Sequence, residues 1–118
     1  MALQVLAFEM MKSLSSEEKI EKILKIVKKK DIVMLEGKLT PDEETYLISK
    51  AMANVSGKFS GIEVAFLSST KSNSFSEKIK NSILKLIAKD RFGITVIGPS
   101  KIIKEIKMDP NKLEILFK

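Results

Sequence analysis

The stretch EGKLTPDEE, residues 36–44, holds the carboxylates whose types and spacing could do chemistry. Clustered carboxylates can coordinate a hard cation or serve as acid and base. The same pattern also begins a helix, because Thr40 suits the N-cap, Pro41 the first helical position and Glu43 the capping-box position. A cation site would need further oxygen ligands at suitable spacing. We therefore interpret residues 40–44 as a helix start.

Glu36 and Gly37 are not explained by capping, because they end a buried strand, where α/β sheets place ligand crevices. A later strand ends at Gly98, and Ser100 then opens a helix whose free backbone N–H groups could hold an anion. The chain contains neither a GxGxxG nor a GxxxxGK[ST] motif. An exposed strand-end glutamate and an ordinary turn are the simpler interpretations. Under the alternative hypothesis of a small ligand-binding or enzymatic domain, Glu36, Gly37, Gly98 and Ser100 share one anion site.

Cysteine and histidine are both absent from the chain. Their absence excludes disulfides, thiolate nucleophiles, Ser-His-Asp and Cys-His catalysis, and metal centres that depend on Cys or His ligands. We therefore expect no haem, no zinc, no iron–sulfur cluster and no other cofactor. A non-enzymatic binding module is the leading hypothesis.

The positive charge of the chain comes from lysine: the net charge is +6, and Arg91 is the single arginine among 21 basic residues. Arginine supplies the planar fork for guanine edges, whereas lysine acts as a mobile point charge. The composition therefore favours attachment to an acidic partner, such as RNA, a ribonucleoprotein or a GTPase, over reading of base sequence. The residues expected to bind this partner are Lys71, Lys78, Lys80, Lys85, Lys89, Arg91, Lys28, Lys29 and Lys30.

Each basic segment also has a structural interpretation. Lys28–Lys30 end a helix and complement its dipole, and the segment 71–91 can be a core helix with solvated lysines. The aromatic residues do not indicate a stacking platform for nucleic acid, because Phe8, Phe66 and Phe92 fall in predicted strands at positions expected to be buried.

The periodicity of apolar residues predicts alternating strands and helices in the order β-α-β-α-β-α-β-α. We expect strands at 3–10, 31–37, 61–68 and 91–98, and helices at 15–30, 40–55, 76–89 and 100–106. This order predicts a single α/β domain, residues 1–118, with a four- or five-stranded parallel or mixed sheet and three to four helices. The alternative is a two-layer α/β sandwich in which the third and fourth strands are antiparallel neighbours.

Two segments lie outside this alternation. Residues 69–76 are polar and are expected to form a mobile loop. The tail, residues 109–118, either adds an edge strand or docks through Leu113, Leu116 and Phe117. A homodimer that pairs through this tail is a third functional hypothesis.

The chain has no apolar run long enough to span a membrane, and its N-terminus lacks the basic region of a signal peptide. A cytoplasmic protein is therefore expected. The richness in Lys, Ile and Glu is typical of heat-adapted proteins, although an AT-rich genome produces the same bias.

Three motifs carry a resemblance to a known family. They are LEGKLTPDEE at residues 35–44, FSGIE at 59–63 and TVIGP at 95–99. Set together, they resemble an archaeal family of unknown function, whose small basic α/β members share LEGxLTPEEE, FxGIE and TVIGP. The members are often encoded near an Era-like GTPase, which implies an association with a GTPase or with RNA. The resemblance implies no catalytic residues.

Overall fold

The computed structural model describes residues 2–53, 61–68, 81 and 93–117, and in this part of the chain four strands form one mixed sheet. The strands are β1 (Leu3–Leu6), β2 (Ile32–Glu36), β3 (Ile62–Ser68) and β4 (Gly93–Pro99), in the order β1-β2-β4-β3. β1 and β2 are parallel, whereas β4 runs antiparallel to both β2 and β3. The predicted α/β domain with a mixed sheet is confirmed, and β3 and β4 are antiparallel neighbours.

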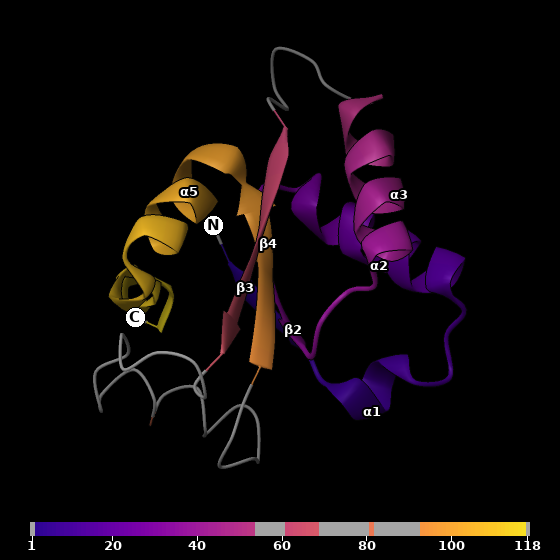
Figure 1. The fold of residues 1–118 in the computed structure, drawn as a ribbon, viewed down its shortest axis with the longest axis horizontal. Coiled ribbons are helices and arrows are strands. Elements are labelled where there is room, and N and C mark those ends of the chain that lie inside the picture. Colours follow the sequence, from indigo (N-terminus) through magenta and orange to yellow (C-terminus); the bar gives the residue numbers. More distant parts are fainter. Residues whose placement is uncertain (1, 54–60, 69–80, 82–92, 118) are drawn as a thin grey trace.

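Helices cover both faces of this sheet (Figure 1). They are α1 (Phe8–Met11), α2 (Ser16–Val27), α3 (Pro41–Met52), α5 (Ser100–Met108) and the 3-10 helix η1 (Pro110–Phe117). α2 and α3 pack on one face, and α5 and η1 on the other. The domain therefore has three layers, and the two-layer alternative is wrong in this respect. None of the helices described is long and apolar enough to cross a membrane.

The central strand β2 explains why the sheet has two cores. Its residues point alternately to the two faces. Ile32 and Met34 join the cluster under α5 and η1, while Val33 and Leu35 join the cluster under α2 and α3. All four are buried. The continuous apolar run in the sequence is thus the signature of a strand covered on both sides, as predicted.

The N-terminal strand is shorter than predicted. β1 ends at Leu6, and the chain turns into the one-turn helix α1 instead of continuing to Met10. The Glu36 carboxylate accepts a hydrogen bond from the Phe8 N–H at 2.9 Å, which fixes the start of α1. Phe8 is 53% exposed, so its predicted burial in a strand is wrong.

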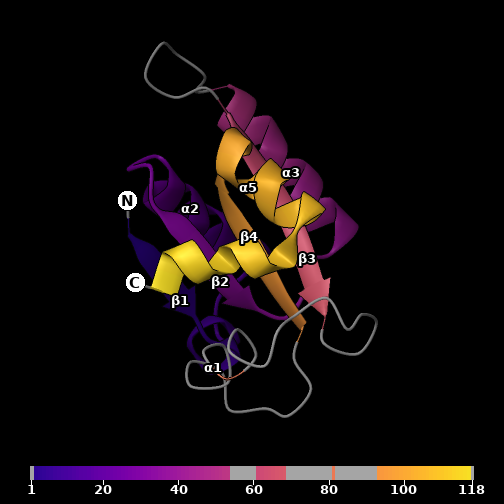
Figure 2. The same cartoon turned by 90° about the vertical axis from the view of Figure 1, so that its left-hand side faces the viewer.

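The C-terminal tail forms η1 and does not add a fifth strand. Figure 2 shows η1 crossing the face of the sheet from α5 toward β1. Leu113 is fully buried, and Leu116 packs against the same cluster. The tail therefore docks on its own domain through these two residues; the Phe117 side chain lies outside the described residues. So do the predicted loop at 69–76 and, apart from Asn81, the predicted helix at 76–89.

Candidate functional site

The two helices on one face of the sheet begin with the same capping chemistry. Ser15 caps α2, where its hydroxyl accepts from the Glu18 N–H at 3.1 Å and the Glu18 carboxylate accepts from the Ser15 N–H at 3.0 Å. Thr40 caps α3 in the same way with Glu43, at 3.1 and 2.9 Å. The interpretation of residues 40–44 as a helix start is therefore confirmed, and two helix N-termini are held in place by side chains.

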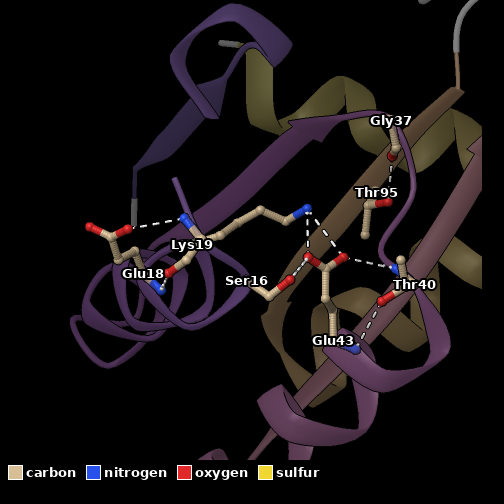
Figure 3. A network of polar contacts seen from close by, with 8 residues as sticks. Ser16, Glu18, Lys19, Gly37, Thr40, Glu43 and Thr95 are labelled. Atoms are coloured by element: carbon tan, nitrogen blue, oxygen red, sulfur yellow. Dashed lines mark hydrogen bonds and ion pairs between the residues drawn. The ribbon is translucent and has the colours of Figure 1, made fainter. Parts of the chain in front are cut away.

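Glu43 does more than cap its own helix, because its carboxylate also reaches α2 (Figure 3). One oxygen accepts from the Thr40 N–H at 2.9 Å and from the Lys19 ammonium at 3.2 Å. The other accepts from the Ser16 hydroxyl at 3.0 Å and lies 3.1 Å from the same ammonium. Glu43 is only 8% exposed. The network therefore ties α2 to α3 through a nearly buried ion pair.

The surroundings of Glu43 determine its protonation. Burial alone would raise the pKa of its carboxyl, but the hydrogen bonds from the Thr40 N–H, Lys19 and Ser16 outweigh burial and lower the pKa below 4.5. The carboxylate is thus ionised at neutral pH and its oxygens are occupied by donors. A general base needs the opposite, a pKa near the working pH and room for a substrate proton. Glu43 therefore has a structural role, and we assign no proton transfer to it.

Two cavities are lined in part by Glu43. One, of about 320 Å³, extends toward α1 and the end of β2 and is lined by Phe8, Met11, Lys12, Leu14, Lys19, Leu35, Glu36, Gly37, Lys38 and Glu43. The other, of about 390 Å³, lies between α2 and α3 and is lined by Ser16, Glu17, Ile20, Thr40, Asp42, Glu43 and Tyr46. Among the described residues, no three Asp or Glu side chains are close enough to hold a metal ion. Glu43 itself lines both cavities.

Glu36 and Gly37 have structural partners at the end of β2. The Glu36 carboxylate holds the Phe8 N–H of α1, as described above. Gly37 has a φ of +99°, which favours glycine, and its carbonyl accepts from the Thr95 hydroxyl at 2.7 Å. Thr95 is only 1% exposed, so this bond satisfies a buried hydroxyl. The LEG turn is therefore held by hydrogen bonds to α1 and β4.

The structure does not bring Glu36 and the Gly98 turn together. In the antiparallel β2–β4 ladder, Glu36 lies opposite Ile94 and Val33 opposite Ile97. Gly98 therefore lies beside the first residue of β2, whereas Glu36 is its last. The two halves of the hypothesised anion site are at opposite ends of the sheet, and we give up the single-pocket hypothesis on this geometry.

Gly98 instead has a packing role. A Cβ atom added there would lie 2.9 Å from the Ile32 Cγ1 and 3.4 Å from the Ile103 Cδ1. Both isoleucines are fully buried. The glycine thus allows β4 to pack closely against β2 and α5 just before Ser100 begins α5.

We expect Gly98→Ala to lower the free energy of unfolding by about 1–2 kcal/mol, because a methyl group overpacks this contact. Urea denaturation followed by circular dichroism measures the change. Lys104→Ala, an exposed change on α5, is the control and should stay within about 0.5 kcal/mol of the parent. An unchanged midpoint for Gly98→Ala would contradict the close packing.

Lys28, Lys29 and Lys30 directly follow α2, with Lys28 as its C-cap, and are exposed. Lys30 has a φ of 67°, the left-handed conformation that commonly terminates a helix. None of the three forms an ion pair with any carboxylate in the described part of the chain. Because they precede the start of β2, they lie at the end of the sheet where β4 finishes and Ser100 and Lys101 begin α5. The structure thus places two sequence candidates, the lysines and the Gly98–Ser100 turn, at one end.

The other lysine candidates cannot be placed. Lys71, Lys78, Lys80, Lys85, Lys89 and Arg91 all fall outside the described residues, and so does Phe92. Phe66 is described and is 42% exposed, so its predicted burial is wrong. The Lys38 ammonium lies over its ring, 5.2 Å from the centroid.

Sequence reasoning missed Lys19 and Ser16 as partners of Glu43, and Thr95 as the partner of Gly37. One signal was available in the sequence. SSEE at 15–18 and TPDEE at 40–44 are both capping motifs. When two capped helices lie on the same face of a sheet, side chains at their N-termini can contact each other. Thr95 is the one polar side chain in the apolar strand of residues 93–99. A buried hydroxyl in that position needs an acceptor.

One known protein family matches most of the chain. Residues 11–118 match the family model described as Origin-associated protein OapB. The chain belongs to this family. The match to the OapB family includes α2, α3, β2, β3, β4, α5 and all of η1 within its bounds, whereas β1 and most of α1 precede it. No curated protein and no solved structure matches the chain.

Proposed function

We propose that this OapB-family protein is a non-enzymatic binding module that engages an acidic partner, the phosphate backbone of a nucleic acid, through exposed lysines. The observation that carries the proposal is the basic end of the sheet, which we define as Lys28, Lys29, Lys30 and Lys101. All four side chains are exposed, and none pairs with a carboxylate of the described residues. Unpaired, mobile ammonium groups attract phosphate without reading base sequence.

The carboxylates also favour a binding module over an enzyme, because those best placed for catalysis already have hydrogen-bond partners. Glu43 and Glu36, the two acidic groups best placed to serve catalysis, are engaged by Lys19 and Ser16 and by the Phe8 N–H. The chain has no histidine or cysteine to replace them. The description of the family as origin-associated also suits a protein that works beside a nucleic acid.

The test measures binding of a single-stranded RNA and of duplex DNA of equal length at several salt concentrations. In the variant K28Q/K29Q/K30Q we expect affinity for the bound nucleic acid to fall more than about tenfold at low salt. For RNA, the slope of log K against log salt should shrink by about 2, since each lost phosphate contact removes about 0.7. Glutamine removes the charge but adds no repulsion at the helix end.

The control variant is K12Q/K22Q/K112Q, which removes the same charge from three exposed lysines elsewhere. It should lower affinity much less. The lysines of the segment 71–91 are tested separately with K78Q/K85Q/K89Q. If neither nucleic acid binds at low salt, or if both test variants bind as tightly as the control, the proposal is wrong.

A GTPase is the second candidate partner. It is favoured by the resemblance to small archaeal proteins encoded near an Era-like GTPase, and an acidic surface on such a protein would attract the same lysines. Titration of the Era-like GTPase encoded nearest to this chain, followed by calorimetry, tests this candidate. Heat of binding that disappears in K28Q/K29Q/K30Q but persists in the control supports it, and absence of binding at low salt rejects it.

A further inference from the structure

β3 lies at an edge of the sheet, opposite the edge formed by β1 (Figure 2). One hydrogen bond shows which way the backbone groups of its neighbour point. The Gly37 N–H donates to the Gly93 carbonyl at 2.9 Å, where the β2–β4 ladder begins. In an antiparallel ladder the N–H and C=O of one residue point to the same side, and the next residue points to the other. Alternate residues of β4 from Ile94 onward therefore point toward β3.

The register then assigns the backbone of β3. The residues opposite Ile94, Val96 and Gly98 are Leu67, Ala65 and Glu63, and these bond to β4. The intervening residues must point their N–H and C=O groups away from the sheet, at the free edge. They are Ile62, Val64, Phe66 and Ser68.

Three of these outward residues, Ile62, Val64 and Phe66, are apolar and lie on the face covered by α2 and α3. Ile62 and Val64 are half-buried against the core on that face, and Phe66 is 42% exposed. No strand in the described part of the chain pairs with their backbone groups. Edge strands are normally protected by a charge, a proline or a bulge. None of the four outward residues is itself charged or a proline, although the Lys38 ammonium lies over the Phe66 ring.

The one charge on β3 points elsewhere. Glu63 belongs to the set that bonds to β4, and its carboxylate pairs with the Lys107 ammonium of α5 at 3.0 Å. It therefore lies on the opposite face and does not obstruct the free edge. Among the described residues the outer edge of β3 is therefore unpaired, and its outward positions from Ile62 to Phe66 are apolar.

We propose that two copies of this chain pair through β3, antiparallel, so that their sheets join into one. A two-fold axis at Val64 places Val64 opposite Val64 of the second copy and Ile62 opposite Phe66. Outward residues then meet outward residues, which the ladder requires. The aromatic and β-branched side chains of Phe66 and Ile62 form a favourable cross-strand pair.

A second copy fits this edge because the strand is its own complement. In the same register Glu63 lies opposite Ala65, so no like charges face each other directly. The net charge of +6 on each copy opposes association, and salt screens that repulsion. Dimerisation should therefore strengthen with salt, whereas nucleic-acid binding weakens. This inference is independent of the proposed function, and the opposite salt dependences distinguish the two.

The first test is sedimentation equilibrium of the full chain over a range of concentrations at low and high salt. We expect a monomer–dimer equilibrium that shifts toward dimer at high salt. In Val64→Pro the outward N–H is lost from both copies, while the ladder with β4 keeps its bonds. Loss of the two hydrogen bonds exchanged at the axis should raise the dimer Kd by about tenfold to a hundredfold. Val64→Ala, which keeps the N–H, is the matched control.

Opposite charges introduced at position 64 of the two copies test the register and the identity of the partner. Val64→Lys and Val64→Glu should each be monomeric, because like charges meet at the axis, whereas their equimolar mixture should form a heterodimer. Circular dichroism melting confirms that each variant is folded. A wild-type chain that is monomeric at every concentration, a Val64→Pro variant that dimerises like Val64→Ala, or a mixture that stays monomeric would overturn the proposal.

Discussion

Replacing Leu113 with alanine should lower the free energy of unfolding by about 3 kcal/mol. Leu113 is fully buried, although it lies near the end of the chain. It belongs to the same apolar cluster as Ile103 and Ile106 of α5 and closes that face of the sheet. Truncation removes three carbon atoms from a filled core and leaves a cavity, which costs more than the loss of burial alone.

Urea denaturation followed by circular dichroism measures this change. Met108→Ala is the control, because Met108 is 87% exposed and its truncation should stay within about 0.5 kcal/mol. A loss smaller than about 1 kcal/mol for Leu113→Ala would mean that η1 does not dock in solution. A tail-mediated homodimer stays a prediction, but cutting the chain after Met108 cannot test it, because the cut would remove Leu113 from the core of each copy.

Replacing Glu43 with alanine is expected to lower the free energy of unfolding by about 2 kcal/mol. The change removes the cap on the Thr40 N–H and leaves the Lys19 ammonium, whose side chain is only 19% exposed, without its carboxylate. Breaking a buried pair costs about 3–5 kcal/mol, and the partial exposure of Lys19 reduces that figure. Glu43→Gln should cost less, because glutamine can still accept from the Thr40 N–H.

The contribution of Glu43 should also depend on pH with a definite sign. Because its pKa is lower in the folded protein than 4.5, the folded state binds the proton less tightly than the unfolded state does. The stability difference between wild type and Glu43→Gln should be complete above about pH 4.5 and should shrink as the pH falls through the lowered pKa. Denaturation at a series of pH values measures it. Glu44→Gln, a charge-matched change of the next residue, is the control, and a difference that grew on acidification would contradict the assignment.

What could be predicted from the sequence was mostly local. Thr40, Pro41 and Glu43 specify the start of α3 through contacts within one turn, so the pattern of residue types was sufficient. The apolar run from Ile32 to Leu35 predicted a strand buried on both faces, because a strand covered on both sides carries apolar residues at successive positions.

The errors arose where distant segments determine the outcome. Glu36 and Gly98 both end strands, and in a parallel sheet such ends share one edge; the antiparallel direction of β4 separates them. Phe66 was expected to be buried because β3 is apolar on both faces, but the strand lies at an edge, where its partner on one side is absent from the described sheet. Neither strand direction nor strand order is encoded in a short window of residues.

The edge of the sheet formed by β1, opposite β3, is expected to unfold locally. β1 has four residues and, among the described strands, pairs with β2 alone; it is tied at its start by Asp31, which accepts from the Ala2 N–H and the Gln4 amide. Its detachment would break the β1–β2 ladder but would leave the antiparallel unit β2-β4-β3 intact. Segments of this kind open at lower free energy than the whole domain, and their amide protons exchange with solvent sooner. We therefore expect the amide protons of β1 to exchange before those of β2, β4 and β3, and the release of β1 would give β2 a free edge of its own.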